Sequence, residues 1–85
     1  MAKSYFVYIV ECADGTYYTG YTTEVERRVA EHNAGKGARY TSGRGPVEVI
    51  HTETYDQRSD AMKREHAIKQ LCRSKKEELI DKSDG

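Results

Sequence analysis

The stretch YFVYIVECADGTYYTGY, residues 5–21, predicts two strands joined by a short turn. Residues 5–12 are mostly β-branched or aromatic, and residues 16–21 are rich in tyrosine and threonine; both compositions favour strands. The connector contains Asp14-Gly15, a pair typical of tight hairpin turns. We therefore expect a β-hairpin at the start of the fold.

The length of the turn decides which side chains share a face of this hairpin. A two-residue loop, Asp14-Gly15, pairs positions whose numbers sum to 29. A three-residue loop that begins at Ala13 gives a sum of 28 and places Gly15 in the left-handed backbone region. Because side chains alternate between faces, only the three-residue loop puts Tyr8 and Tyr18 on the same face.

A helix and a third strand are expected after the hairpin. Thr23 and Glu26 have the spacing of a capping box, which predicts a helix start, and the helix is expected to run to about Asn33. The glycines that follow end it. Residues 47–52 are again rich in β-branched side chains and predict the third strand.

Two further helices complete the predicted pattern. Ser59 is a predicted N-cap for a helix over about 60–72, and a second capping box at Ser74 predicts a short helix over about 74–82. The element order is then β-β-α-β-α-α. This order predicts an α+β fold in which helices flank a small three-stranded, mainly antiparallel sheet.

Length and composition favour one domain over residues 1–85, since a chain of 85 residues with 36% hydrophobic residues supports a single thin core. No apolar run is long enough to span a bilayer and no signal-peptide pattern opens the chain. We therefore expect a cytoplasmic protein that does not contact membranes. Cys12 and Cys72 lack metal-ligand spacing, which argues against a zinc site, and we interpret them as reduced thiols in or near the core.

The charges are balanced in number but not in position. The net charge is zero, which argues against a general polyanion binder. Basic residues gather in the segments 36–44 and 58–76, whereas acidic residues gather at 48–56 and 77–84. This distribution predicts one basic face, with ordinary solvated helix surfaces as the alternative interpretation.

Glu65 occupies an unexpected position in the predicted second helix. It lies four residues after Ala61 and three before Ile68, and so falls on the apolar stripe. A carboxylate that faces a core is costly unless it is paired or binds a metal. Two interpretations follow, a metal ligand or a salt bridge at the rim of the core, for example with a nearby arginine.

Arg28 and His32 are spaced four residues apart and share a face of the first predicted helix with Val25 and Val29. An arginine at the edge of an apolar stripe can hold a phosphate by two parallel hydrogen bonds. It can also pack its aliphatic stem and leave its head in water. A histidine at this position can accept a proton or can be a structural residue with a satisfied ring.

Four elements in this order resemble the motifs of the GIY-YIG nuclease superfamily, over residues 5 to about 72. The segments Val7-Tyr8-Ile9 and Tyr18-Thr19-Gly20 are similar to the paired GIY and YIG elements. Arg28 lies in a segment similar to the helix motif of the superfamily. Glu65 matches the metal-binding glutamate of the following helix.

The segment 37–46 is also similar to the structure-specific branch of the superfamily and to its small stand-alone members. The chain departs from the motif at Val7, where the superfamily has glycine, and at Thr19, where it has isoleucine. We expect these two changes to affect strand packing more than chemistry. We expect no separate DNA-reading module after the core, and therefore expect recognition of substrate structure in place of recognition of sequence.

The resemblance implies a role for each residue of the site. Glu65 is expected to hold a single divalent metal, Mg²⁺ or Mn²⁺, near the scissile phosphate, and Arg28 to neutralise the charge that develops on that phosphate. Tyr8 and Tyr18 are expected to orient or activate the attacking water, with His32 as a relay or an alternative base. A site that contains both tyrosines requires them on one face, so the three-residue loop is predicted.

The implied partner is nucleic acid, with DNA as the expected class. Backbone contacts and base stacking are expected from six residues: Lys36, Arg39, Tyr40, Arg44, Lys63 and Lys69. The leading hypothesis is a metal-dependent endonuclease that recognises DNA by structure, as in DNA repair. The alternatives are a catalytically weak or inactive nucleic-acid-binding module that works with a protein partner, and a scaffold for protein interactions.

Overall fold

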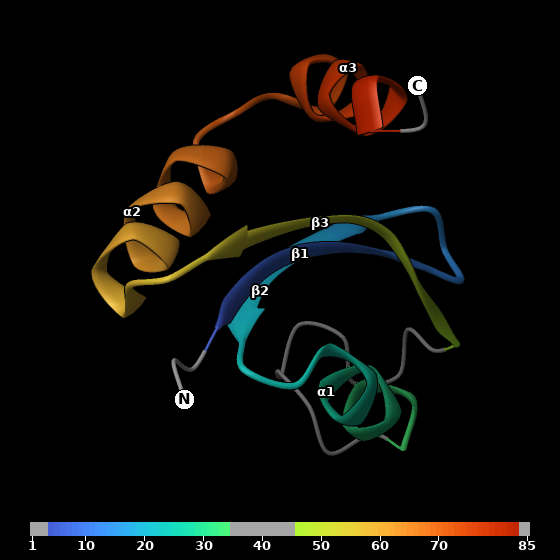
Figure 1. The fold of residues 1–85 in the computed structure, drawn as a ribbon. Coiled ribbons are helices and arrows are strands. Elements are labelled where there is room, and N and C mark those ends of the chain that lie inside the picture. Colours follow the sequence, from blue (N-terminus) through green and yellow to red (C-terminus); the bar gives the residue numbers. More distant parts are fainter. Residues whose placement is uncertain (1–3, 35–45, 84–85) are drawn as a thin grey trace.

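A three-stranded antiparallel sheet forms the centre of the fold, as the sequence predicts (Figure 1). The computed structural model describes residues 4–34 and 46–83. The strands are β1 (Tyr5–Cys12), β2 (Tyr17–Thr22) and β3 (Val47–Tyr55). Their order in the sheet is β2-β1-β3, and β1 pairs antiparallel with both neighbours.

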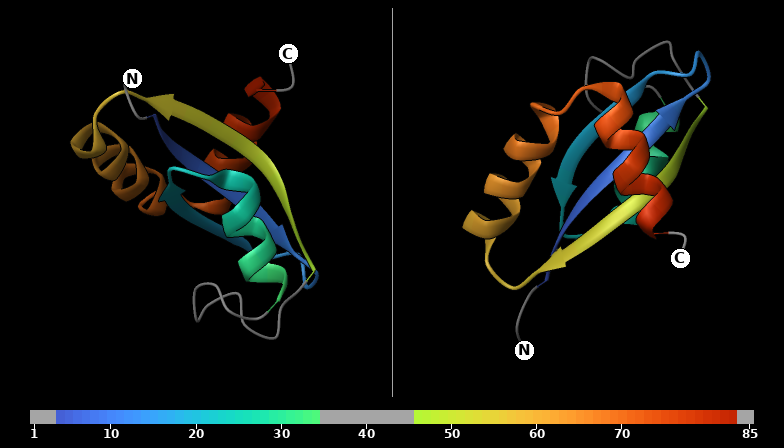
Figure 2. Two further views of the ribbon diagram at one scale, coloured as in Figure 1. Left: turned by 60° about the horizontal axis from the view of Figure 1, so that its bottom comes forward. Right: turned by 90° about the horizontal axis from the view of Figure 1, so that it is seen from above.

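Helices cover both faces of this sheet. Helix α1 (Val25–Asn33) lies on one face, whereas α2 (Arg58–Lys69) and α3 (Arg73–Ser83) lie on the other (Figures 1 and 2). The predicted order β-β-α-β-α-α and the α+β class are therefore confirmed. None of the described helices is both long enough and apolar enough to cross a membrane.

Strand β1 supplies two cores because it is the central strand. Val7 and Ile9 point to the face that α2 and α3 cover and are fully buried. Tyr8 and Val10 point to the opposite face, where Val29 of α1 packs beside them. A strand that is buried on both faces has a continuous apolar sequence, and this run made β1 recognisable.

The hairpin has the predicted three-residue loop. Gly15 has a φ of 84°, in the left-handed region, and its amide donates to the carbonyl of Cys12 at 2.9 Å. The register pairs Tyr8 with Gly20, positions that sum to 28. Even-numbered positions of both strands therefore point to the α1 face, and Tyr18 shares this face with Tyr8.

The predicted capping box at the start of α1 is wrong. The N-cap residue is Glu24 and not Thr23, and no side chain caps this helix end. The Thr22 hydroxyl instead accepts a hydrogen bond from the backbone amide of Glu24 at 3.2 Å. The helix therefore begins one residue later than expected. The Glu24 carboxylate pairs with Arg27 at 3.0 Å.

The starts of the last two helices also differ from the prediction. Helix α2 begins after Gln57, and Ser59 lies inside its first turn. Helix α3 begins at Arg73, so Ser74 is helical and does not act as a cap. Cys12 is buried as expected, but Cys72 is exposed, because it lies in the short turn between the two helices.

Strand β3 is longer than predicted. It was expected over residues 47–52 but extends to Tyr55, because Tyr5 at the start of β1 pairs with Tyr55. The register of this pair shifts between Ile9 and Val10, which marks a bulge. The added length brings two more side chains of β3 under α2.

Candidate active site

An aromatic cluster lies on the α1 face of the sheet. Tyr8 is 1% exposed, and its hydroxyl lies 3.1 Å from Nε2 of His32. The ring of Tyr18 completes the cluster, with its centroid 6.4 Å from that of Tyr8 and 5.3 Å from that of His32. The structure therefore brings together three of the predicted catalytic side chains, from β1, β2 and α1.

Gly20 gives the Tyr8 ring its space. A Cβ atom at Gly20 would lie 2.6 Å from the Tyr8 hydroxyl oxygen and 3.2 Å from a ring carbon of Tyr18. The first distance is far shorter than a normal contact, so any side chain at this position displaces the ring. The Tyr18-Thr19-Gly20 element therefore requires glycine at its third position, because any larger residue would clash with Tyr8.

Arg28 lies beside the cluster on α1, with its side chain 31% exposed. Its contact with the Glu31 carboxylate is long, at 3.5 Å. Although burial lowers the pKa of Arg28, hydrogen bonding to Tyr8 and Glu31 outweighs it and raises this pKa further. The guanidinium is therefore charged at all relevant pH values and has donors left for an anion.

The two buried groups of the cluster are uncharged at neutral pH. Burial raises the pKa of Tyr8, and hydrogen bonding to Arg28 opposes this rise in part. Burial, followed by the nearby charge of Arg28, lowers the pKa of His32, against a smaller effect of Glu31. A neutral imidazole can accept a proton, so His32 has the protonation state that a relay requires.

Glu65 approaches this cluster from α2. Its side chain is 19% exposed, and Oε1 lies 3.4 Å from Nζ of Lys69. The Lys69 ammonium lies 5.8 Å from the centroid of the Tyr18 ring. The charge of Glu65 also raises the pKa of Tyr8. Glu65 is thus connected to the aromatic cluster through Lys69 and through charge, and its ion-pair partner is a lysine and not an arginine.

Glu65 fits a metal site of one carboxylate. The described residues contain no group of three or more His, Cys, Asp or Glu side chains that could hold a metal ion. Mg²⁺ commonly keeps several waters and binds one or two carboxylates together with substrate phosphate. Glu65 is partly exposed and its Oε1 lies 3.4 Å from Nζ of Lys69, so its carboxylate could supply such a ligand.

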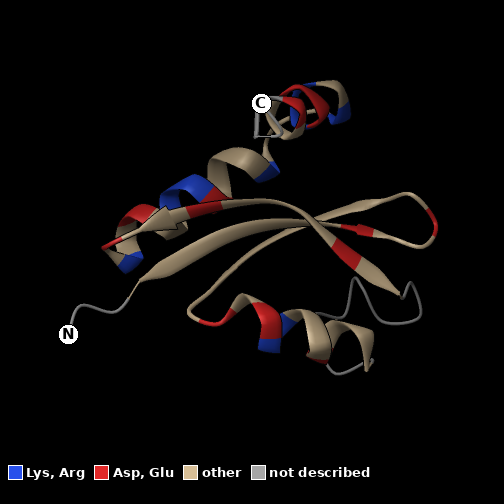
Figure 3. Cartoon of the chain, turned by 45° about the vertical axis from the view of Figure 1, so that its right-hand side comes forward, with Lys and Arg blue, Asp and Glu red and all other residues tan. Residues whose placement is uncertain are grey.

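Only two of the six predicted nucleic-acid contacts lie among the described residues. Four of them lie outside the described residues: Lys36, Arg39, Tyr40 and Arg44. Lys69 lies beside Tyr18, whereas Lys63 is exposed on α2. Both signs of charge occur on α2 and α3 (Figure 3). The predicted basic face includes the segment 36–44, which lies outside the described residues, so it stays a prediction.

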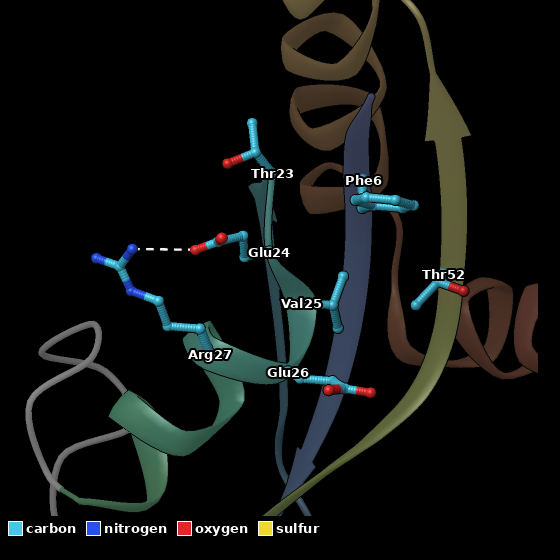
Figure 4. Close-up of a pocket in the computed structure, with 7 residues that line it drawn as sticks. All are labelled: Phe6, Thr23, Glu24, Val25, Glu26, Arg27 and Thr52. Atoms are coloured by element: carbon cyan, nitrogen blue, oxygen red, sulfur yellow. Dashed lines mark hydrogen bonds and ion pairs between the residues drawn. The ribbon is translucent and has the colours of Figure 1, made fainter. Parts of the chain in front are cut away.

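One hollow of the described surface is separate from the aromatic cluster (Figure 4). It has a volume of about 640 Å³ and lies beside the N-terminal end of α1, next to Phe6 and Val25. Glu24, Glu26 and Arg27 also line it, but none of the predicted catalytic residues does. Arg28 lines a smaller hollow of about 140 Å³ together with Glu24, Arg27 and Glu31.

A second polar cluster lies on the opposite face of the sheet and was not predicted. Glu53 accepts hydrogen bonds from Nε of Arg64 at 2.8 Å, from the Tyr55 hydroxyl at 2.6 Å and from Nε2 of His51 at 2.7 Å. Although burial raises the pKa of Glu53, these bonds lower it to about 2. We call these four residues the Glu53 cluster.

The sequence held a signal for this cluster. His51, Glu53 and Tyr55 alternate along β3, as residues on one face of a strand do. The signal was missed because the strand was predicted to end at Thr52, before two of the three. Arg64 is adjacent to Glu65 in α2, so its bonds to Glu53 also fix how α2 is rotated against the sheet.

Comparisons with known proteins agree with the resemblance in the sequence. Residues 4–78 match a family model described as the GIY-YIG catalytic domain. A UPF0213 protein of Natronomonas pharaonis is 61% identical over 85 residues, with 100% of both chains covered. A UPF0213 protein of Halobacterium salinarum is 66% identical over 74 residues, which cover 87% of this chain and 96% of that protein.

Two solution NMR structures have a similar fold. That of a UPF0213 protein from Bacillus halodurans is 49% identical, with a TM-score of 0.61, and covers 92% of this chain and 83% of its own. That of a protein from E. faecalis is 49% identical, with a TM-score of 0.66, and covers 96% of this chain and 88% of its own. The similarity therefore extends over nearly the whole fold.

Proposed function

The chain belongs to the GIY-YIG catalytic domain family, and we propose that it is a metal-dependent endonuclease that acts on DNA. This domain type implies a nuclease-type function; the substrate, the metal and the residue roles are our proposal. The observation that carries it is the neutral Tyr8–His32 pair beside the charged, partly exposed Arg28. We further propose that DNA is recognised by its structure.

The Tyr8–His32 pair would accept the proton of the attacking water. Tyr18 is half-buried and lies nearer to solvent than Tyr8, so it would position this water. Tyr8 alone is a poor base because its pKa is raised. As Tyr8 accepts the proton of the water, it would pass its own proton to Nε2 of His32, 3.1 Å away.

Arg28 would bind the phosphate that is attacked. Its guanidinium can donate two parallel hydrogen bonds to phosphate oxygens. Charge grows on these oxygens during attack, so the interaction is stronger in the transition state than in the ground state. The long contact with Glu31 is readily exchanged for a phosphate.

Glu65 would hold one divalent ion, Mg²⁺ or Mn²⁺, with water and substrate phosphate as the other ligands. When bound, such an ion neutralises phosphate charge and lowers the pKa of water. Arg64 would keep Glu65 directed towards the site, because its bonds to Glu53 fix the rotation of α2.

A nucleic-acid-binding module without strong catalysis, working with a protein partner, is the second candidate. The observation in its favour is the ion pair of Glu65 with Lys69, which already gives this carboxylate a cation. In that case the Lys69 ammonium takes the place of the metal. The protein would then bind nucleic acid without cleaving its phosphodiester bonds.

A nuclease assay distinguishes the two candidates. Single-stranded, duplex and branched DNA would be incubated with Mg²⁺, with Mn²⁺ or with chelator. We expect cleavage that requires the metal and that Glu65→Gln reduces at least about 100-fold. Asp60→Asn, an exposed carboxylate on the same helix, is the matched control and should cleave as the wild type does. Undiminished cleavage by Glu65→Gln, or binding to DNA without any cleavage, would contradict the proposal.

A further inference from the structure

A basic groove lies at the edge of the sheet that β2 forms, near the junction of α2 and α3. Figure 2 shows how these elements are arranged. The groove consists of two adjoining hollows of about 340 and 200 Å³ that share Tyr17 and Lys76. Lys69 lines one hollow and Arg73 the other. Among the residues that the structure describes, no acidic side chain lines either hollow. We call it the β2-edge groove.

Lys76 is the least compensated charge in this groove. Lys69 pairs with Glu65 at 3.4 Å, and Arg73 pairs with Glu77 at 3.0 Å. Among the described residues, no carboxylate forms an ion pair with Lys76. Burial, followed by the positive charge of Lys69, lowers the pKa of Lys76. A half-buried ammonium next to another cation is unfavourable unless an anion joins them.

Aromatic rings and cations alternate along the groove. The Arg73 guanidinium lies 4.5 Å from the Tyr17 ring centroid, and the Lys69 ammonium lies 5.8 Å from that of Tyr18. Proteins that bind nucleic-acid strands combine such rings, which support bases, with cations that follow the backbone. Tyr18 belongs to both the groove and the aromatic cluster, so the groove begins at the candidate active site.

We propose that the β2-edge groove binds a backbone phosphate next to the one that is cleaved, with Lys76 as its main contact. A phosphate between Lys76 and Lys69 relieves the repulsion of the two ammonium groups. The strand then continues over Tyr17 towards Arg73. This inference rests on the proposed function and specifies where the substrate strand leaves the site. It adds Lys76, Arg73 and Tyr17 to the surface that recognises nucleic acid.

Lys76 and Lys75 offer a matched pair for the test. Both lie in the first turn of α3, but Lys75 is exposed and pairs with Glu78 at 3.6 Å. Binding of a fluorescein-labelled single strand and of a labelled branched duplex would be measured by anisotropy, with chelator present to prevent cleavage. We expect Lys76→Gln to weaken binding about fivefold at low salt and to reduce the slope of log K against log salt by about 0.7 for the single strand.

Lys75→Gln should change neither the affinity nor the salt slope. Lys76→Arg should keep both at their wild-type values, which separates an effect of charge from an effect on folding. Equal effects of Lys75→Gln and Lys76→Gln would overturn the proposal, and so would a wild type that binds neither probe. The assay is independent of catalysis. If Lys76→Gln alone weakens binding but the wild type never cleaves DNA, the β2-edge groove is supported and the proposed nuclease activity is contradicted. If the wild type cleaves DNA but Lys76→Gln binds as the wild type does, only the role of the groove is contradicted.

Discussion

Two polar clusters occupy opposite faces of the same sheet, and they differ in how their charges are balanced. In the Glu53 cluster, one carboxylate receives hydrogen bonds from Arg64, Tyr55 and His51 at 2.6 to 2.8 Å. On the α1 face, the contact of Arg28 with Glu31 is 3.5 Å long. In the Glu53 cluster, the carboxylate is paired within the protein. On the α1 face, the Arg28 guanidinium can still donate hydrogen bonds to a ligand.

The difference separates a structural role from a functional one. The half-buried Glu53 carboxylate already accepts four hydrogen bonds, so it fixes geometry and has little acceptor capacity left for a ligand. An arginine with a long, exchangeable contact beside a neutral tyrosine and histidine contributes little to stability. It is instead ready to bind an anion. We therefore expect changes in the Glu53 cluster to act on folding and changes at Arg28 to act on chemistry.

The largest effect on stability is expected for Glu53→Gln. The variant leaves the Arg64 guanidinium without its carboxylate, and the loss of this half-buried ion pair is expected to cost up to about 3 kcal/mol of unfolding free energy. Urea denaturation would measure the loss. Glu48→Gln, an exposed position on the same strand, should change this free energy by less than about 0.5 kcal/mol. Equal losses in the two variants would show that the Glu53 cluster is not structural.

Acid should weaken the wild type through the same residue. The pKa of Glu53 is about 2 in the fold and 4.5 in the reference state. Because the folded pKa is the lower one, Glu53 stabilises the fold above pH 4.5, and this contribution is lost as the pH falls towards 2. The loss is at most about 3–4 kcal/mol. Denaturation curves from pH 6 down to about 2 should converge for the wild type and Glu53→Gln; parallel curves would contradict the assignment.

A smaller loss of stability with a large loss of activity is expected for Gly20→Ala. The new methyl group would meet the Tyr8 hydroxyl at 2.6 Å, which costs about 1–3 kcal/mol and displaces the ring from His32. Gly15→Ala is the matched control, because its φ of 84° is strained for alanine, yet nothing lies within 4 Å of the added atom. It should lose about 1 kcal/mol and retain cleavage. Cleavage at the wild-type rate by Gly20→Ala would contradict the role of Tyr8.

The hairpin and its register followed from the sequence, because a side-chain alternation and one glycine decide them. The helix caps did not. Thr23 and Ser74 have the spacing of capping boxes, but the chain enters each helix at another residue, since packing on the sheet sets the start. Local sequence cannot resolve such competition between neighbouring caps.

The site was predictable in part, for a physical reason. Tyr8 and Tyr18 share a face because strand register is a local rule. His32 was assigned to the site through the resemblance to the superfamily, since its contact with Tyr8 forms only when α1 packs on the sheet. The groove around Lys76 depends on where α3 lies relative to β2, and no local pattern encodes that placement. The partner of Glu53 was missed for the same reason, since Arg64 meets it only after α2 packs on β3.

The most direct test of the account is the rate of metal-dependent DNA cleavage by Arg28→Gln, measured beside Arg27→Gln. The two arginines are adjacent on α1, but Arg27 is exposed and pairs with Glu24, whereas Arg28 lies against Tyr8. We predict that Arg28→Gln lowers the rate at least about 100-fold with little change in unfolding free energy, and that Arg27→Gln cleaves normally. Equal rates in the two variants would contradict it.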